Sequence, residues 1–151
     1  MNAESQILEK WIEKVADSHP QNAAAIRAQT PDPFRNPVGY AIRASLSQLW
    51  EQLLGKMETG AVDRALDTIL RIRALQDISP GEAVTFITDL QPLICQLPDE
   101  PDRALLEARI DRLALAASDK YQQCCEQVAA VRLHEVERLS HAHRMPRKAR
   151  P

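Results

Sequence analysis

The chain has 151 residues, a formal net charge of -2, and 44% hydrophobic and 26% charged residues. This length suits one compact domain with a single core, and the composition is that of an ordinary globular protein. The small net charge gives the molecule no global electrostatic reason to bind nucleic acid or an anionic membrane, so partners must be inferred from local features.

The sequence predicts a cytoplasmic protein without a membrane span. No apolar stretch approaches the roughly 18 to 20 residues that cross a bilayer, and the start MNAESQILEK lacks the basic-then-apolar order of a secretory signal. The three cysteines, Cys95, Cys124 and Cys125, are an odd number, which suits a reducing compartment.

Helical periodicity dominates the chain, and no alternating pattern indicates a β-hairpin. The first helix is predicted to begin at Ser5, a suitable N-cap, and to end near Ser18, and a short helix over 20–28 follows. Residues 30–39 hold three prolines and a glycine, which is typical of a turn, and Phe34 is expected to pack inward as an aromatic plug.

Two further amphipathic helices are predicted over 40–54 and 61–76, joined by a turn at Gly55 and Gly60. Their apolar residues recur at helical spacing and are expected to face one core. The prediction is therefore an all-α fold built as a single helical bundle.

The signals for a helix start converge at Ser79. Ser79 can cap the helix, Pro80 suits its first position, and Glu82 completes a capping box. The helix is predicted to tolerate or kink at Pro92 and to end before Pro98.

The last helix is predicted to be unusually long. From residue 101 to Pro146 there is no interior proline or glycine, and apolar residues recur at alternating steps of four and three. A helix of about 40 residues is roughly 60 Å long, so its C-terminal half should protrude or find a partner. We expect a homodimer through residues 110–139, with these candidate interface residues: Ile110, Leu113, Ala117, Tyr121, Cys124, Val128 and Val131. Residues 1–140 then form the domain, and 141–151 a basic flexible tail.

A polar cluster at Arg73, Gln76 and Asp77 ends an apolar helix just before the capped helix start. These groups either tie two helix ends together by hydrogen bonds or line a pocket for a small signal molecule, with Arg73 pairing an anionic group. Asp111, Asp119 and Tyr121, on the long helix, either share this environment or are solvated.

No arrangement for catalysis, metal or cofactor binding can be recognised. The four histidines, His19, His134, His141 and His143, lie in a turn or near the end of the long helix, so neither a metal site nor a haem site is predicted. The recurring apolar residues of the last helix form an apolar stripe. Cys124 falls on this stripe and is expected in the core, whereas Cys125 lies off it and is the candidate redox thiol. The prediction is a protein that is not an enzyme and needs no cofactor.

Six motifs along the chain carry a family resemblance. They are Ile7-Leu8-x-x-Trp11, Phe34-x-Asn36-Pro37-Val38-Gly39, Ile72-Arg73-Ala74-Leu75-Gln76-Asp77-x-Ser79-Pro80-x-x-Ala83-Val84-x-Phe86-Ile87, Ile110-Asp111-x-Leu113-Ala114-Leu115, Asp119-x-Tyr121 and Cys124-x-Glu126. With these residues the chain resembles the RsbRD-type N-terminal domain of RsbT co-antagonist proteins, the RsbR-like scaffolds of stressosomes.

The resemblance implies a globin-like helical domain without haem that passes a signal through its last helix to a C-terminal STAS domain. The implied function is non-catalytic sensing or scaffolding, with protein partners, in a bacterial stress pathway; the alternative is a helical protein that binds haem or another small ligand. The 151 residues hold no STAS domain and no phosphorylatable STAS threonines, so we expect either a stand-alone member or a chain that stops at a domain boundary. Cys125 stands where the family pattern has arginine, and Gly81 where it has serine.

Overall fold

The computed structural model describes residues 2–18, 23–28, 32–98 and 101–144. This part of the chain contains seven helices and no strand, which confirms the all-α prediction. In chain order the helices are α1 (Ala3–Asp17), α2 (Ala23–Arg27), α3 (Pro37–Leu54), α4 (Thr59–Leu75), α5 (Pro80–Thr88), α6 (Leu90–Ile94) and α7 (Pro101–Arg144).

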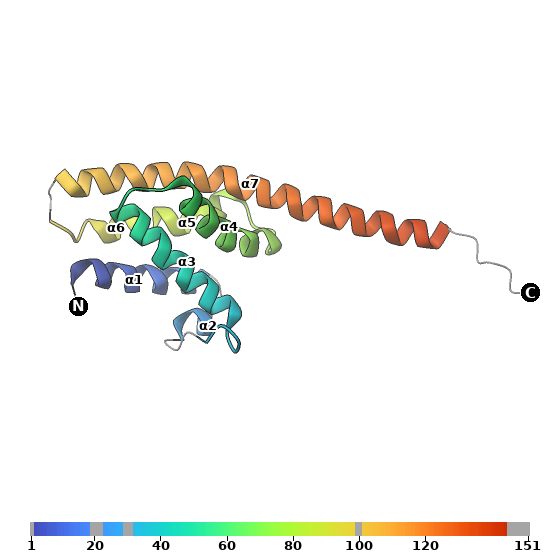
Figure 1. The fold of residues 1–151 in the computed structure, drawn as a ribbon, viewed down its shortest axis with the longest axis horizontal. Coiled ribbons are helices and arrows are strands. Elements are labelled where there is room, and N and C mark those ends of the chain that lie inside the picture. Colours follow the sequence, from blue (N-terminus) through green and yellow to red (C-terminus); the bar gives the residue numbers. More distant parts are fainter. Residues whose placement is uncertain (1, 19–22, 29–31, 99–100, 145–151) are drawn as a thin grey trace, which may run out of the picture.

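The N-terminal half of α7 forms one side of the helical bundle (Figure 1). It packs mainly against α4 and α5, while α3 packs on α4, and α1 contacts α2, α3, α5 and α6. The helices enclose one hydrophobic core, in which Trp11, Leu49, Ile69 and Phe86 have no exposed surface. No described helix is long and apolar enough to span a bilayer.

The second half of α7 extends past the other helices (Figure 1), as predicted. The helix has 44 residues, which corresponds to a length of about 66 Å at 1.5 Å per residue. Beyond Val128 the described side chains are exposed except that of Ser140, which is half-buried. We call residues 129–144 the protruding segment. The helix continues through 141–144, where we expected the tail to begin, and residues 145–151 lie outside the described part.

Two helices start earlier than predicted because asparagine, not serine or tyrosine, stands at the boundary. Asn2 caps α1, and its side chain accepts a hydrogen bond from the Ser5 backbone at 2.8 Å. Asn36 caps α3 by accepting from the Gly39 backbone at 3.2 Å, and Pro37 occupies the first turn. The predicted turn over 30–39 includes Pro37, but the structure places this residue in the first turn of α3, where the N–H that proline lacks is not needed.

The predicted cap at Ser79 is confirmed, since its hydroxyl accepts a hydrogen bond from the Glu82 backbone at 3.2 Å. The kink predicted at Pro92 takes the form of a break at Asp89, between α5 and α6. Proline has no N–H to donate to the carbonyl four residues earlier, which belongs to Thr88, the last residue of α5.

The prediction that Phe34 packs inward is wrong, because its side chain is 94% exposed. The Asp32 carboxylate accepts hydrogen bonds from the backbone N–H groups of Phe34 and Arg35 at 3.0 and 3.4 Å. The backbone N–H of Asn36 closes the turn onto the Asp32 carbonyl at 2.9 Å. This local hydrogen bonding turns the aromatic ring outward.

Candidate functional site

Arg73 lies buried where α1, α4 and α5 meet, with only 2% of its surface exposed. Its Nη2 donates to the Ser18 hydroxyl at 2.8 Å and its Nη1 to the Glu82 carbonyl at 3.3 Å. The guanidinium carbon lies 5.3 Å from the centre of the Phe86 ring, within cation–π range. We call Arg73, Ser18, Glu82 and Phe86 the arginine junction.

Among the residues that the structure describes, no carboxylate forms an ion pair with the buried Arg73 guanidinium of the arginine junction. Burial lowers the pKa of Arg73, and Asp89 and Tyr121 partly offset that shift, yet a guanidinium stays protonated at neutral pH. Its Nε is a buried nitrogen that has no hydrogen-bond partner in the described part of the chain. Burying such a charge has a desolvation cost, so the hydrogen bonds of Arg73 add little net stability to the three helices.

Phe86 connects the arginine junction to the centre of the core. Its ring stacks on Trp11, with the centroids 6.5 Å apart and the planes at 14°. The Trp11 indole donates to the Phe86 carbonyl at 2.5 Å. This pairing cannot be predicted from the sequence pattern, because helical periodicity does not indicate which aromatic residues of two helices meet.

Tyr121 joins α7 to the turn between α4 and α5. Its side chain is buried, and its hydroxyl donates to the Ile78 carbonyl at 2.5 Å. Burial, followed by the neighbouring Cys125 thiol, raises the pKa of Tyr121 to about 12. The turn itself carries Asp77 in the left-handed region, at a φ of 56°, which asparagine and aspartate tolerate better than most residues.

The native chain should lose folding stability between pH 10 and pH 12, and the Tyr121→Phe variant should lose less of it. The folded state favours the neutral phenol of Tyr121. Its contribution to the free energy of unfolding is therefore fully present below pH 10 and is lost as the pH rises towards 12. A rise from 10.0 to about 12 corresponds to at most about 2.7 kcal/mol. Urea unfolding of both proteins at pH 9 and pH 11 measures this difference. Equal stability losses in the native chain and the variant would contradict the assignment.

The structure brings together part of the predicted polar cluster. Asp77 and Arg73 both lie close enough to Tyr121 for their charges to shift its pKa, Asp77 upward and Arg73 downward. Gln76 is half-buried and follows the end of α4, where its backbone N–H donates to the Arg73 carbonyl at 3.0 Å. Asp119 is exposed on α7, facing away from Tyr121, which is two residues further on. Asp111 lies elsewhere and accepts from Gln91 of α6 at 2.8 Å.

Most of the predicted dimer interface lies in the protomer's own core. The side chains of five candidates are buried, so they are not available to a second chain in this fold; these are Ile110, Leu113, Ala117, Tyr121 and Cys124. Val128 is half-buried and Val131 is exposed. The predicted apolar stripe of α7 is present, but its first part packs against α4, α5 and α6 of the same chain. An apolar helix face does not need a second chain to cover it.

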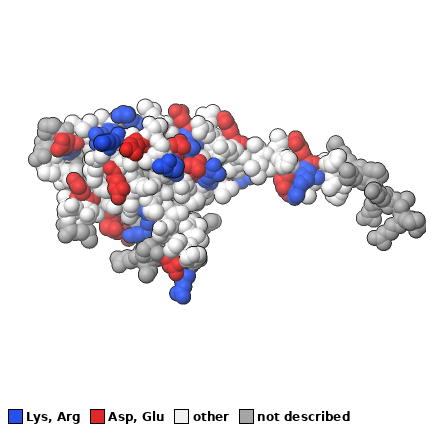
Figure 2. Space-filling view, viewed as in Figure 1, with Lys and Arg blue, Asp and Glu red and all other residues white. Residues whose placement is uncertain are grey.

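The protruding segment carries a different apolar face. The predicted stripe continues after Val131 to Glu135 and Arg138, which form an ion pair at 2.6 Å. Leu133, Val136 and Leu139 are exposed on an adjacent face of the helix. In Figure 2 the segment has a mostly uncharged stretch where it leaves the bundle, with acidic and basic residues further out.

The two adjacent cysteines have different surroundings. Cys124 is buried, as predicted, and its thiol lies 3.9 Å from the Asp67 carboxylate. Burial raises the pKa of Cys124, and Asp67 adds to this shift, so the thiolate is disfavoured. Cys125 is half-buried beside Tyr121. Its role as a redox thiol remains a prediction.

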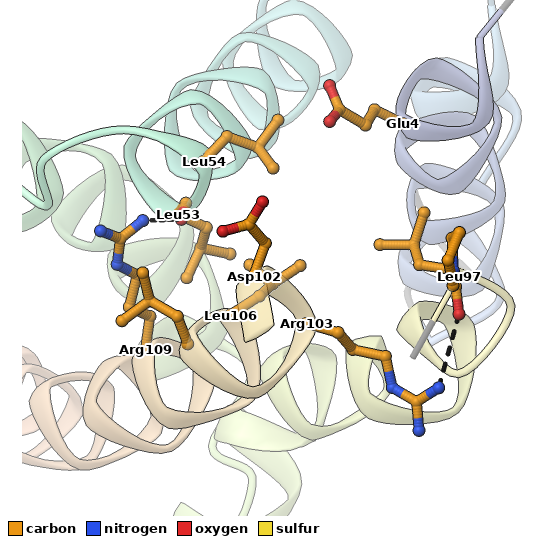
Figure 3. Close-up of a pocket in the computed structure, with 10 residues that line it drawn as sticks. Glu4, Leu53, Leu54, Leu97, Asp102, Arg103, Leu106 and Arg109 are labelled. Atoms are coloured by element: carbon orange, nitrogen blue, oxygen red, sulfur yellow. Dashed lines mark hydrogen bonds between the residues drawn. The ribbon is translucent and has the colours of Figure 1, made fainter. Parts of the chain in front are cut away.

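A pocket with a volume of about 500 Å³ lies between α1, α3 and α7 (Figure 3). The start of α1 and the start of α7 are at the end of the bundle opposite the protruding segment (Figure 1). We call this pocket the end pocket. It is formed by the N-terminus of α1, the C-terminus of α3, the chain after α6 and the first turns of α7. The lining residues are Glu4, Leu53, Leu54, Leu97, Pro98, Asp102, Arg103, Leu105, Leu106 and Arg109.

Comparison with known proteins assigns the chain to a family. The family model described as the RsbT co-antagonist protein RsbRD N-terminal domain matches residues 5–136. The chain belongs to this family. The RsbRD N-terminal domains are part of regulatory proteins of the stressosome, a stress-signalling assembly, so stressosome proteins are the implied partners. Comparison with curated proteins found no match, and comparison with solved structures found none either.

The RsbRD match ends inside the protruding segment, at residue 136. It therefore includes the arginine junction, Tyr121 and the point where α7 leaves the bundle. These features belong to the region that makes this chain an RsbRD domain, while Leu139 lies beyond the match.

Proposed function

We propose that this chain is a non-catalytic sensory or scaffold domain of a bacterial stress-signalling pathway, which relays a signal through α7 as a homodimer. The observation that carries the proposal is the protruding segment with its uncovered apolar face, in a chain of the RsbRD family. An apolar helix face outside a core favours association with another helix. Stressosome proteins are cytoplasmic, and we place this chain in the cytoplasm.

The contacts at the base of the protruding segment support the relay. The Tyr121 hydroxyl donates a hydrogen bond to the Ile78 carbonyl, in the turn after α4. Lys120 forms ion pairs with Asp63 and Asp67 of α4 at 3.1 and 3.4 Å. The arginine junction links the same end of α4 to α1 and α5. A ligand or partner that shifts these helices would therefore move the part of α7 from which the protruding segment emerges.

The regulatory character of the RsbRD family supports a role without catalysis. Haem bound through a histidine would require that histidine to lie inside the bundle. The histidines that the structure describes, His134, His141 and His143, are exposed on the protruding segment. Their positions therefore favour the sensory role over haem bound by one of these histidines. The globin-like relationship that the family resemblance implies remains part of this proposal.

The proposed dimer interface is the face that carries Ala129, Leu133, Val136 and Leu139. Ala129, Leu133 and Val136 follow one another at steps of four and three, the spacing of a helix–helix seam. This assignment keeps the predicted region of residues 110–139 but moves the seam to its exposed C-terminal part. A C2 pair would place the same face of α7 on both sides of the contact.

Val136→Glu should dissociate the dimer and leave the bundle folded. A carboxylate in the apolar seam must be desolvated without a partner, so the dissociation constant should rise at least about tenfold. His134→Glu is the matched control, because residues two apart on a helix point about 160° away from each other. Light scattering after size-exclusion chromatography measures the mass of each protein over a range of concentrations.

A monomeric native chain at high concentration, or equal dimerisation of both variants, would contradict the proposed seam. The absorbance spectrum recorded in the same run tests the alternative function. A Soret band in the purified protein, or one that develops after haem addition, would favour haem binding over the sensory role.

A further inference from the structure

The end pocket combines apolar walls with two carboxylates that point into the same space. Leu53 and Leu106 are buried at its base, and Leu54 and Leu105 are partly exposed at its rim. Figure 3 shows Glu4 of α1 and Asp102 of α7 extending into the opening between α1, α3 and α7. Neither carboxylate takes part in an ion pair within the described part of the chain.

The two arginines of the end pocket are engaged with the chain. Arg109 donates to the Leu53 carbonyl at 2.8 Å. Arg103 donates to Glu107 at 3.2 Å and to the Leu97 carbonyl at 3.4 Å, and Figure 3 shows it directed away from the opening. Both guanidinium groups keep their positive charge but are held against the pocket wall, so the charged groups that extend into the opening are the carboxylates. The pocket fits a group that combines an apolar body with a cation.

The chain displays such a group on its own surface. Phe34 is 94% exposed, and the side chain of the next residue, Arg35, is 91% exposed and only loosely paired with Asp32, at 3.6 Å. The volume of the end pocket, about 500 Å³, leaves room for an aromatic ring with a guanidinium beside it. We call Phe34 and Arg35 the Phe-Arg knob.

The turn that carries the Phe-Arg knob is anchored to the bundle. Asn36 donates from its Nδ2 to the Ala25 carbonyl at 2.7 Å and caps α3 with its Oδ1. The Asp32 carboxylate accepts hydrogen bonds from the backbone of the turn itself. A side chain presented on a held turn loses less conformational entropy on binding than one on a free loop. An exposed aromatic residue in this setting is typical of an interface anchor.

We propose that the Phe-Arg knob of one copy of this chain docks into the end pocket of a second copy. The Phe34 ring contacts the leucines, and Arg35 exchanges its contact with Asp32 for Glu4 and Asp102. The two surfaces differ, so the contact is heterologous and can repeat from copy to copy. It is separate from the α7 seam, and together the two contacts link dimers into a larger assembly.

Site-specific photo-crosslinking tests the docking directly. The full chain carries benzoylphenylalanine in place of Phe34, and isotope-labelled and unlabelled proteins are mixed before irradiation. We expect cross-links between labelled and unlabelled chains that map to peptides around Leu53, Leu97 and Leu106. Cross-links confined to single chains, located at other surfaces, or absent would overturn the proposal.

Charge exchange shows whether the pairing is specific. Glu4→Lys together with Asp102→Lys should reduce the yield of mixed cross-links by about tenfold, the effect of losing roughly one good interfacial interaction. Arg35→Glu in the knob-bearing copy should restore the yield with this pocket variant. The α7 variant Val136→Glu should retain the cross-links, so failure of the seam and failure of the docking are distinguishable. Circular dichroism verifies the fold of each variant.

A small-molecule probe tests the competing occupant. Phenethylamine has an aromatic body and a cation, and phenylacetate is its anionic counterpart. Competition of phenethylamine, but not phenylacetate, with the mixed cross-links supports docking in the end pocket. Binding of phenethylamine to the pocket without any mixed cross-link would overturn the proposal and assign the pocket to a small cationic ligand.

Discussion

Leu113→Glu should unfold the protomer, whereas Leu115→Glu, two residues away on the same helix, should leave it folded. Leu113 has no exposed surface and Leu115 is 71% exposed. A carboxylate at position 113 would be buried among apolar side chains without a partner, which costs roughly 4 kcal/mol or more. This is a large share of the roughly 5 to 15 kcal/mol by which a domain is stable.

Urea unfolding followed by circular dichroism measures both variants. The Leu115→Glu variant should remain within about 0.5 kcal/mol of the native chain, as surface substitutions usually do. The pair also separates the core from the dimer seam, because neither residue belongs to the protruding segment. A folded Leu113→Glu variant with native stability would show that this face of α7 is not covered by α4 and α5.

Gly39→Ala should destabilise the chain by about 3 kcal/mol, as expected for a group forced into a filled space. A Cβ at this position would lie 2.6 Å from the carbonyl carbon of Ala25 and would meet the side chain of Asn36. The obstacle is backbone, so a rotamer change does not relieve it. The same Asn36 side chain caps α3 and holds α2, and its displacement would loosen the turn that carries the Phe-Arg knob.

Gly81→Ala is the matched control for Gly39→Ala. It lies in the first turn of α5 with nothing within 4 Å of an added Cβ. Alanine there should raise the free energy of unfolding by about 0.5 to 1 kcal/mol, because it restricts the unfolded chain and suits the helix. Thermal unfolding of both variants should show opposite shifts, and a loss of stability in both would contradict this account of Gly39.

The proposed relay and the proposed docking use different ends of the bundle. The arginine junction and Tyr121 lie near the point where α7 emerges, whereas the end pocket surrounds its first turns. Occupation of the end pocket by a second copy would therefore act on the same helix that carries the dimer seam. The structure offers one element, α7, through which assembly and signal can influence each other.

The sequence by itself determined the features that depend on neighbouring residues. The helical class, the Ser79 cap and the length of α7 follow from periodicity, local hydrogen bonding and the absence of breakers over a long stretch. The burial of Cys124 also followed from its place on the stripe. The motif from Ile72 to Ile87 was sufficient to indicate the family, and that region contains Arg73.

Only the tertiary structure decided what covers each apolar face. The stripe from Ile110 to Cys124 is covered by the chain itself, while Leu133 and Val136 are uncovered, and periodicity is equally satisfied by either arrangement. The outward direction of Phe34 depended on Asp32 hydrogen bonds that outweigh the tendency of an aromatic ring to be buried. Likewise, Arg73 meets Ser18 and Phe86 because three helices converge there. Spacing along one helix specifies a face, but the partner of that face depends on how distant segments pack.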